Sequence, residues 1–322
     1  MGGSREAGAR GAPHRENPRR ADARRHRPRP GPPLLLGPRG PCPPDPGGGR
    51  PLPRLAPGRD GVSRRRWALV LGGGGARGAA YLGVLAALGE AGLTPDLVVG
   101  VSIGAIAGAV YCQAGSAALP RLRAVARAVA PEGRRLLGTA RRRALLEEDL
   151  GLRGAAFEAL PIPLRVTATA LPTLRRVVLG DPPAPPLVEA VLASSALPLH
   201  SPIDLSGIRH YDGGLAGNLP ALVALQRGCQ VLFCVPLGVI FRREVGWRRF
   251  LPWKAVDAFG WAMMRRGVRT CRAAGATILE AYSPAIEAES VFAFGSLDKF
   301  EEEGYKAALL VVPSLQTLLA AP

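Results

Sequence analysis

Two short apolar runs constrain the fold of this chain more than any other feature. Residues 67–71 (Trp-Ala-Leu-Val-Leu) and 97–101 (Leu-Val-Val-Gly-Val) have the length of a strand and carry no charge. Runs without polar alternation are typical of strands that are buried on both faces. Each run leads through a tight glycine-containing turn into apolar residues with helical spacing, at 79–88 and 105–114. This repeated strand–turn–helix order predicts an α/β fold with helices packed on a parallel sheet.

The residues before Trp67 have a different composition. Residues 1–66 contain 16 Arg, no Lys, five acids, 14 Pro and 12 Gly, which gives them +11 of the total charge of +17. A segment with so few side chains to bury does not offset the entropy lost on ordering. We therefore expect a disordered tail at 1–66 and one large domain at 67–322. Its motif-bearing core is expected at 67–237 and a C-terminal helical part at 238–322.

Several classes of protein are not indicated. The five cysteines show no CxxC spacing, so the sequence predicts neither a zinc site nor a disulfide framework. The N-terminal residues lack the apolar core of a signal peptide. Residues 97–120 are uncharged, but seven Gly, Ser and Gln residues lower their hydrophobicity, so we do not expect a transmembrane helix. These features predict a cytoplasmic chain, with peripheral membrane contact as an option.

The positive charge favours weak attraction to any polyanion. The tail has no aromatic residue on which a base could stack, so specific nucleic-acid recognition is not expected. Residues 121–143 carry eight Arg, and their apolar spacing predicts an amphipathic helix whose basic face is either solvated or meets anionic lipid. Aromatic and basic residues alternate at 247–254, which suits either a lipid headgroup interface or an ordinary hydrophobic loop. The oligomeric state cannot be inferred.

Further elements follow from local patterns. Apolar and β-branched residues predict paired strands at 164–171 and 175–179, with a turn at Pro172, and a buried strand at 231–237. Helices are predicted at 187–193, 254–282 and 299–311.

Ser102 lies in Gly100-Val101-Ser102-Ile103-Gly104, directly between a predicted buried strand and an apolar helix. A serine on such a sharp turn is exposed at the carboxyl edge of the sheet, and flanking glycines avoid clashes with the neighbouring helix and strand. The helix N-terminus also directs backbone dipoles toward the serine. This context favours a nucleophile over a serine that only packs or caps the helix.

A glycine-rich loop at 72–78 also follows a strand and precedes a helix. Such a loop presents successive N–H groups to an anion, which can be a bound phosphate or a transient oxyanion. The spacing Gly73-x-Gly75-x-x-Gly78 matches a dinucleotide fingerprint, with Asp96 as the candidate acid. However, Asp96 precedes the second strand instead of ending it. With Ser102 at the end of the neighbouring strand, an oxyanion hole is the more economical interpretation.

The residue that activates Ser102 is better predicted as an acid than as a histidine. The domain holds two histidines, His200 and His210, and neither follows a suitable acid as a Ser–acid–His order requires. Asp212 stands at an apparent strand end before two glycines. A carboxylate held about 2.6–3.2 Å from a serine hydroxyl can accept its proton directly. The sequence therefore favours a Ser102–Asp212 dyad, against the alternative of a turn-forming Asp-Gly pair.

Three motifs in this order and spacing resemble the patatin-like phospholipase family, in its bacterial type. They are Gly-Gly-Gly-Ala-Arg-Gly at 73–78, Gly-Val-Ser-Ile-Gly at 100–104 and Asp-Gly-Gly at 212–214. The resemblance extends over about residues 67–311. Supporting segments are Ala-Ser-Ser-Ala-Leu-Pro at 193–198, Gly-Asn-Leu-Pro at 217–220 and Gly304-Tyr305. One departure is Ala170, where relatives often carry an Asp.

The resemblance implies a three-layer α/β/α fold and hydrolysis of lipid acyl esters, as in phospholipase A, lysophospholipase or esterase activity. It implies Ser102 as nucleophile, Asp212 as base and an acyl-serine intermediate, without metal or cofactor. The oxyanion hole falls on the amides of Gly73, Gly74 and Gly75. The supporting motif residues are Arg77, Gly78, Gly100, Gly104, Gly213 and Gly214, of which Arg77 either orients the loop or meets a lipid phosphate. The alternative function is a non-catalytic lipid- or nucleotide-binding module that uses the glycine-rich loop.

Overall fold

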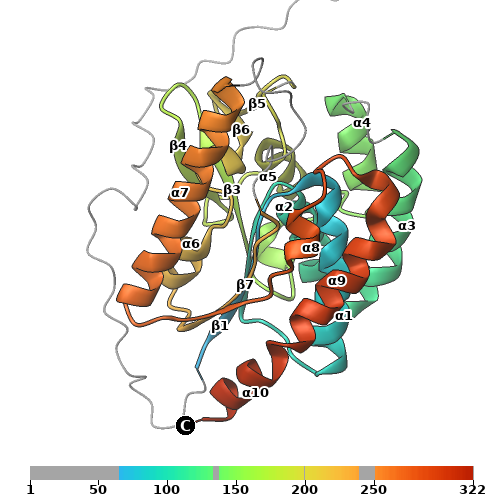
Figure 1. Ribbon diagram of the computed structural model, residues 1–322. Helices are drawn as coiled ribbons and strands as arrows, with labels where there is room; N and C mark the ends of the chain where they lie inside the picture. The colour runs from blue at the N-terminus through green and yellow to red at the C-terminus, as the bar shows by residue number, and fades with distance from the viewer. Residues whose placement is uncertain (1–64, 133–137, 199, 239–250, 322) are drawn as a thin grey trace, which may run out of the picture. The chain divides into compact units, whose positions relative to one another are not determined.

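The computed structural model describes residues 65–132, 138–198, 200–238 and 251–321, and its centre is one eight-stranded sheet (Figure 1). The expected tail at 1–66 falls almost wholly outside these residues, as does the start of the aromatic and basic segment 247–254. The strands are β1 (Trp67–Leu71), β2 (Leu97–Val101), β3 (Leu164–Ala170), β4 (Arg175–Leu179), β5 (Ile203–Leu205), β6 (Ile208–Asp212), β7 (Val231–Val235) and β8 (Thr277–Glu280).

The sheet is mainly parallel, as the strand–turn–helix order predicts. Its order is β5-β6-β3-β2-β1-β7-β8, and β4 pairs with β3 outside this path. The pairs β3–β2, β2–β1, β1–β7 and β7–β8 are parallel, whereas β4 and β6 both run antiparallel to β3. The carboxyl ends of the central strands therefore lie at one edge of the sheet.

Helices cover both faces of the sheet (Figure 1). The described α-helices are α1 (Ala80–Glu90), α2 (Ile103–Ala114), α3 (Leu119–Val129), α4 (Thr139–Ala144), α5 (Leu187–Ser194), α6 (Ala221–Gln226), α7 (Leu251–Ala273), α8 (Pro284–Glu287), α9 (Leu297–Leu309) and α10 (Val312–Ala320). The larger buried cluster includes side chains of α1, α2, α5 and α9, and the smaller one includes side chains of α6 and α7. The result is a three-layer α/β/α arrangement.

Strand β1 shows why an apolar run without alternation forms this sheet. Trp67, Leu69 and Leu71 point into the larger cluster, while Ala68 and Val70 point into the smaller one. All five residues are fully buried. Because both faces of the strand are covered, every position favours an apolar side chain.

The predicted helix at 254–282 is wrong at its C-terminal end. Helix α7 ends at Ala273, and Thr277–Glu280 form the edge strand β8. Gly275 adopts φ +87°, a left-handed conformation that ends a helix, and Thr277 and Ile278 are β-branched residues that suit a strand. The C-terminal part expected to be helical thus also contributes to the sheet.

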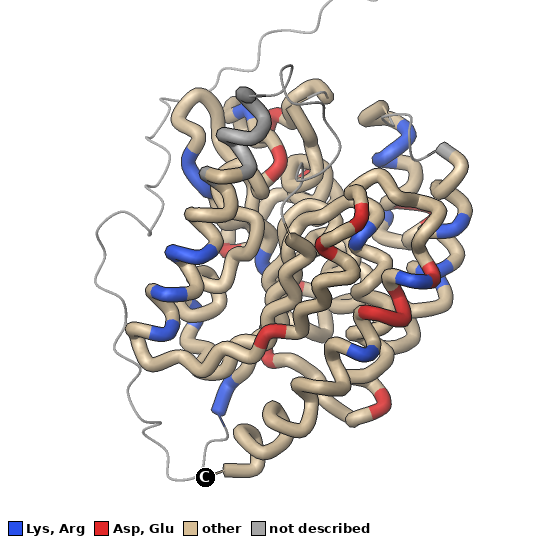
Figure 2. The backbone as a smooth tube through the Cα atoms, in the orientation of Figure 1, with Lys and Arg blue, Asp and Glu red and all other residues tan. Residues whose placement is uncertain are grey.

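The predicted amphipathic helix at 121–143 is divided. Helix α3 ends at Val129 and a separate helix α4 begins at Thr139, with residues 133–137 outside the described ranges. Two arginines of α3 pair with acids of α9, where blue and red segments adjoin in Figure 2. Arg127 Nη2 lies 2.9 Å from Asp298 Oδ1, and Arg123 Nε donates to Glu301 Oε1 over 3.1 Å. Part of the basic face therefore binds a neighbouring helix.

One described helical stretch, Ile103–Val129, passes a length and composition test for a membrane span, and half of its most apolar window is buried inside the structure. It is not one continuous α-helix, because the 3-10 turn η3 (Gly115–Ala118) separates α2 from α3. Buried core helices pass the same test, and most of α2 is buried against the sheet.

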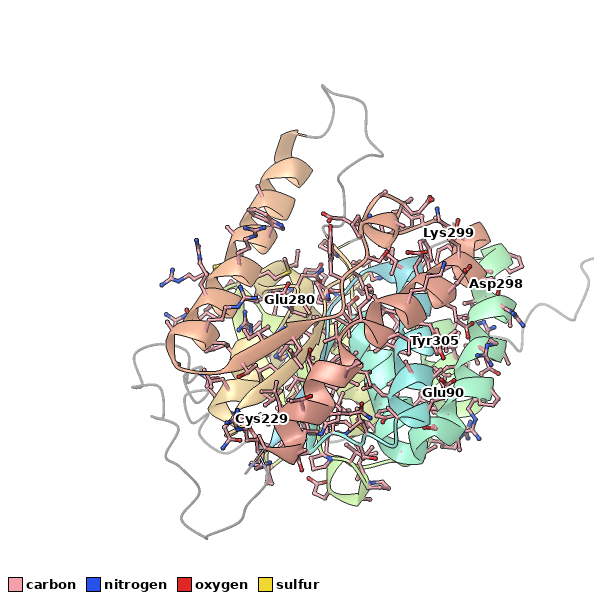
Figure 3. All side chains as sticks on the ribbon, turned by 60° about the horizontal axis from the view of Figure 1, so that its bottom comes forward. Glu90, Cys229, Glu280, Asp298, Lys299 and Tyr305 are labelled. Carbon is pink, nitrogen blue, oxygen red and sulfur yellow. The ribbon has the colours of Figure 1, made fainter. Side chains whose placement is uncertain are left out.

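Helices α1 and α9 cross at two glycines. A Cβ at Gly304 would lie 2.1 Å from the Ala80 carbonyl oxygen, and one at Gly83 would lie 2.0 Å from the Glu301 carbonyl oxygen. Tyr305 Oη also donates to Glu90 Oε2 over 2.6 Å, and Figure 3 labels both residues. The two backbones are thus in direct contact, which only residues without a side chain permit.

We expect Gly304→Ala to destabilise the protein by about 1–3 kcal/mol, because the added methyl group overpacks this crossing. Gly267→Ala is the matched control, since Gly267 also lies inside a helix and a Cβ there would meet nothing within 4 Å. The control should be neutral or stabilising by up to about 1 kcal/mol, through improved helix propensity. Urea unfolding of both variants measures the difference. Equal effects would contradict the proposed close contact.

Candidate active site

Strand β3 brings the ends of two other strands together. Strand β2 ends with Val101 beside Thr167, and β6 ends with Asp212 beside Ala168. Since β4 occupies the other edge of β3 along the same residues, β2 and β6 share one edge and approach each other end to end. Ser102 directly follows β2, so the serine and Asp212 are placed at neighbouring positions along β3.

Ser102 lies on a strained turn. Its φ of 56° and ψ of −125° are unusual for a residue with a side chain, and α2 begins at the next residue. The turn is tight on both sides. A Cβ at Gly100 would lie 2.5 Å from the Gly104 carbonyl oxygen, and one at Gly104 would lie 2.4 Å from the Leu71 carbonyl oxygen. The two motif glycines are therefore required by packing, as the sequence predicts.

The backbone of Ser102 is fixed by a residue that sequence reasoning placed only in a supporting segment. The Ser102 N–H donates to Ser194 Oγ over 2.9 Å, and the Ser194 hydroxyl donates to the Thr167 carbonyl oxygen over 2.8 Å. Ser194 is fully buried at the end of α5. This relay connects the serine turn to β3 and explains why a small hydroxyl residue stands there.

Asp212 is a buried carboxylate. It is 3% exposed, and its Oδ1 accepts a 2.7 Å hydrogen bond from the Gly214 N–H. Burial raises the pKa of Asp212 to about 6, while the Ser102 hydroxyl, the Gly214 amide and the charge of Arg142 each lower it. Oδ2 is buried without a hydrogen bond of normal geometry to any described residue. The serine hydroxyl is thus close enough to Asp212 to lower the pKa of its carboxyl.

Glycines after Asp212 allow this approach. A Cβ at Gly213 would lie 2.2 Å from the Thr167 carbonyl oxygen, and one at Gly214 would lie 3.0 Å from Asp212 Oδ1. Thr169 Oγ1 donates to the Asp212 carbonyl oxygen over 2.8 Å. The Asp-Gly-Gly motif therefore serves to pack the strand end against β3.

Arg142 on α4 was not predicted as a site residue. Its Nη1 donates to the Ser195 carbonyl oxygen over 2.7 Å, next to the serine that binds Ser102. Burial lowers the pKa of Arg142, and the charge of Asp212 opposes that change. Arg142 stands between two other arginines, so the sequence does not distinguish it from them. In the structure its neighbours Arg141 and Arg143 form ion pairs at the surface.

The glycine-rich loop lies against Ser102. A Cβ at Gly73 would be 3.2 Å from the Ser102 Cβ and 2.4 Å from Asn218 Oδ1. The Gly73 N–H already donates to the Asn218 carbonyl oxygen over 3.2 Å. The amides of Gly74 and Gly75 form no hydrogen bond to another described residue. The predicted oxyanion hole therefore retains two unengaged donors of the three expected.

Asn218 joins the loop to the aspartate motif. Its Nδ2 donates to the Gly73 carbonyl oxygen over 2.9 Å and to the Gly238 carbonyl oxygen over 3.3 Å. A Cβ at Gly214 would lie 2.9 Å from Asn218 Oδ1. One buried amide thus contacts both motifs, which assigns a physical role to the segment at 217–220.

Arg77 faces the protein interior. It is 2% exposed, with Nη1 donating to the Leu237 carbonyl oxygen over 2.9 Å and Nε donating to the Glu289 carbonyl oxygen over 3.0 Å. A Cβ at Gly78 would lie 2.3 Å from Ile103 Cγ1. Both residues hold the loop against later segments, which favours the orienting role for Arg77 over contact with a lipid phosphate.

Asp96 does not lie near the glycine-rich loop. Its Oδ2 accepts a 2.9 Å hydrogen bond from the Trp67 N–H at the start of β1, whereas the loop follows the end of that strand. The acid of the dinucleotide interpretation is therefore at the opposite end of the sheet. Neither His200 nor His210 has a described hydrogen bond to Ser102 or Asp212.

The described residues contain no cluster of His, Cys, Asp and Glu that could hold a metal ion. Four cysteines lie in the described ranges, and all are buried free thiols: Cys112, Cys229, Cys234 and Cys271. Burial raises the pKa of each thiol, so these cysteines act as core residues.

Residues 69–225 match the family described as patatin-like phospholipase. The chain is 28% identical over 276 residues to patatin-like phospholipase domain-containing protein 6 of mouse and of human, which covers 74% of this chain and 20% of each relative. It is 66% identical over 44 residues to neuropathy target esterase sws of Drosophila melanogaster, over 14% of this chain and 3% of the relative. The chain thus spans about a fifth or less of the length of these relatives.

Two solved structures match this chain weakly and at low identity. VipD from Legionella pneumophila matches with a TM-score of 0.40 at 15% identity, over 79% of this chain and 67% of its own. ExoU from Pseudomonas aeruginosa, solved in complex with SpcU, matches with a TM-score of 0.40 at 17% identity, over 81% of this chain and 54% of its own.

Asp212→Asn should stabilise the protein at high pH. A carboxyl whose pKa is raised from 3.8 to about 6 destabilises the folded state increasingly as the pH rises between these two values, and by up to about 3 kcal/mol above pH 6. Below about pH 4 the carboxyl is protonated in both states and the effect disappears. We expect a gain of about 1–3 kcal/mol at pH 8 and almost none at pH 4, measured by urea unfolding. Asp298→Asn, at an exposed position, is the control. A loss of stability at pH 8 would contradict this account of Asp212.

Proposed function

Since residues 69–225 belong to the patatin-like phospholipase family, we propose that this chain is a lipid acyl hydrolase acting through Ser102 and Asp212. The observation that carries the proposal is the meeting of β2 and β6 on one edge of β3. It sets a serine on a strained turn beside a buried carboxylate whose pKa is close to neutral. No structural role explains both features, because each costs stability.

The reaction proceeds in two acyl-transfer steps. Asp212 accepts the hydroxyl proton as Ser102 Oγ bonds to the ester carbonyl carbon, and the carbonyl oxygen becomes an oxyanion. Collapse of this intermediate expels the alcohol, which takes the proton from Asp212, and leaves an acyl-serine. Water then bonds to the acyl carbon as Asp212 accepts its proton, and the carboxylic acid departs as Ser102 regains a proton.

The glycine-rich loop supplies the oxyanion hole. The amides of Gly74 and Gly75 belong to a loop that is held on both sides. Asn218 donates to the Gly73 carbonyl oxygen, and Arg77 anchors the loop to the carbonyl oxygens of Leu237 and Glu289. Donors that do not reorganise during the reaction stabilise the developing charge most strongly. The Ser102 amide does not contribute, because it is bonded to Ser194.

The alternative of a binding module without catalysis has less support. A nucleotide site would need an acid at the end of β2, where this chain carries Ser102, and Asp96 is at the other end of the sheet. A lipid-binding module would not need the serine and aspartate side chains to meet. The substrate is therefore expected to be an acyl ester of a lipid, in the phospholipid, lysophospholipid or neutral ester class.

Ser102→Ala should abolish fluorophosphonate labelling and lower lipid ester hydrolysis by at least about 10³-fold, because no other hydroxyl occupies the turn. The measurement compares wild type and variant on a panel of phospholipids, lysophospholipids and neutral esters. Ser116→Ala, at an exposed serine after α2, is the matched control and should label normally. Labelling that persists in Ser102→Ala would refute this nucleophile. Tight mononucleotide binding without ester hydrolysis would favour the binding module.

The kcat/KM of hydrolysis should fall at acidic pH as Asp212 becomes protonated, with a midpoint near pH 6. Arg142→Gln removes a positive charge that lowers this pKa, so the midpoint should move to higher pH. We expect kcat/KM at pH 6 to fall roughly 2- to 10-fold, with a smaller change at pH 8. Arg141→Gln, on the same helix but paired with Asp149 at the surface, should leave the profile unchanged. A midpoint that stays fixed in Arg142→Gln would show that this charge does not act on the base.

A further inference from the structure

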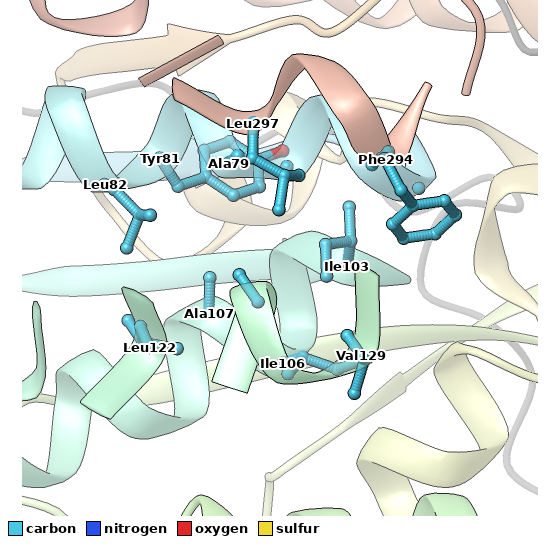
Figure 4. Close-up of a pocket in the computed structure, with 14 residues that line it drawn as sticks. Ala79, Tyr81, Leu82, Ile103, Ile106, Ala107, Leu122, Val129, Phe294 and Leu297 are labelled. Atoms are coloured by element: carbon cyan, nitrogen blue, oxygen red, sulfur yellow. The ribbon is translucent and has the colours of Figure 1, made fainter. Parts of the chain in front are cut away.

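An apolar hollow lies beside the serine turn, on the face of the sheet covered by α1, α2, α3 and α9 (Figure 4). Its volume is about 100 Å³, and one end is open to solvent. An apolar cavity of about 150 Å³ binds benzene. The hollow is therefore large enough for a short hydrocarbon segment.

The walls of the hollow offer almost no polar group. Ile103 and Ala107 come from α2, Leu122 and Ala126 from α3, and Leu297 from the start of α9. Tyr81 on α1 also lines the hollow, but its hydroxyl donates to the Gly72 carbonyl oxygen. Only its ring is then available to a ligand. A site whose side chains offer no free donor suits a hydrocarbon chain.

The hollow borders the candidate active site. Ile103 directly follows the nucleophile Ser102, and Gly75 of the oxyanion loop lines the same space. The Ile103 side chain also packs on the loop at Gly78. An ester carbonyl held at Ser102 would therefore have the hollow immediately next to it.

Burial changes along the hollow. Ile103, Val129 and Phe294 lie together at one end in Figure 4, and all three are partly exposed. Leu82 and Leu122 lie toward the other end and are 5% and 8% exposed. The end at Ile103 is thus the more open one, and the floor lies deeper between α1 and α3. From Ile103 to Ala107 the axis of α2 advances only roughly 6 Å.

We propose that this hollow binds the acyl chain of the substrate and limits its length, so that the enzyme prefers esters of medium-chain acids over those of long-chain acids. The proposal rests on the proposed hydrolase function and adds the acyl specificity of its site. A chain longer than the hollow would have to remain outside or displace buried leucines. Burial of each methylene inside the hollow contributes about 0.8 kcal/mol.

Two positions on α3 offer a matched pair of variants. Ala126 lines the hollow and is partly exposed, so a larger side chain can be accommodated without disrupting the core. Ala124 lies two residues away on the same helix and is exposed to solvent. Ala126→Phe should fill the hollow, whereas Ala124→Phe adds the same ring outside it.

The test measures kcat/KM for acetyl, octanoyl and hexadecanoyl esters of p-nitrophenol. We expect wild type to prefer octanoyl, and Ala126→Phe to lower octanoyl turnover relative to acetyl by at least about 10-fold. Ala124→Phe should keep the wild-type ratio. Leu82→Ala, which deepens the floor, should shift the preference toward the hexadecanoyl ester. Equal loss on all esters in Ala126→Phe, or the same ratio in both Phe variants, would overturn the proposal.

A binding measurement separates this proposal from the hydrolase function. Dodecanoic acid should bind the Ser102→Ala protein in calorimetry, and adding Ala126→Phe should weaken binding at least about 10-fold while Ala124→Phe does not. If wild type hydrolyses no ester but this binding pattern holds, the proposed hydrolase function fails and the hollow remains an acyl-chain site. Unchanged binding in the Ala126→Phe background would overturn the acyl-chain site itself.

Discussion

The edge of β3 is the constraint on which the rest of this structure depends. A strand edge offers one row of backbone hydrogen bonds, and here β2 uses the first part while β6 uses the continuation from the opposite direction. Two strands that meet end to end leave their last residues adjacent, whatever the distance between them in sequence. Ser102 and Asp212 are therefore brought together by backbone pairing, and the loops between β2 and β6 can vary without separating them.

Two energetically costly positions in this site are held by closely packed surroundings. Ser102 occupies a backbone conformation that costs on the order of 1–3 kcal/mol, and Asp212 buries a carboxylate with few partners. The surrounding residues over-determine both positions: Gly100 and Gly104 allow close backbone contacts, and Ser194 fixes the serine amide. Such local costs are tolerated when a large hydrophobic core offsets them, and they are characteristic of functional sites.

The sequence allowed correct prediction of the sheet core and of the strand–turn–helix order around the glycine turns, because buried parallel strands and glycine turns leave a strong local pattern. The position of β6 at the end of β2 could not be predicted, since strand order depends on contacts between residues that are far apart in sequence. Strand β8 was missed because Thr277–Glu280 directly follow a long helix and carry too few residues for a clear period. Arg142 was hidden among other arginines, and only its burial next to Ser195 distinguishes it.

The crossing of α1 and α9 bears on which residues are needed for a stable fold. The family match covers residues 69–225, yet β7, which pairs with β1, and α9, which rests on the bare backbone of α1, come later. A fragment of residues 69–225 would lack β7 and α9. One edge of β1 would then be unpaired, and Gly83 of α1 would have no helix packed on it. Segments outside the family match can therefore be indispensable to the architecture, and the boundary of such a match is not the boundary of a foldable unit.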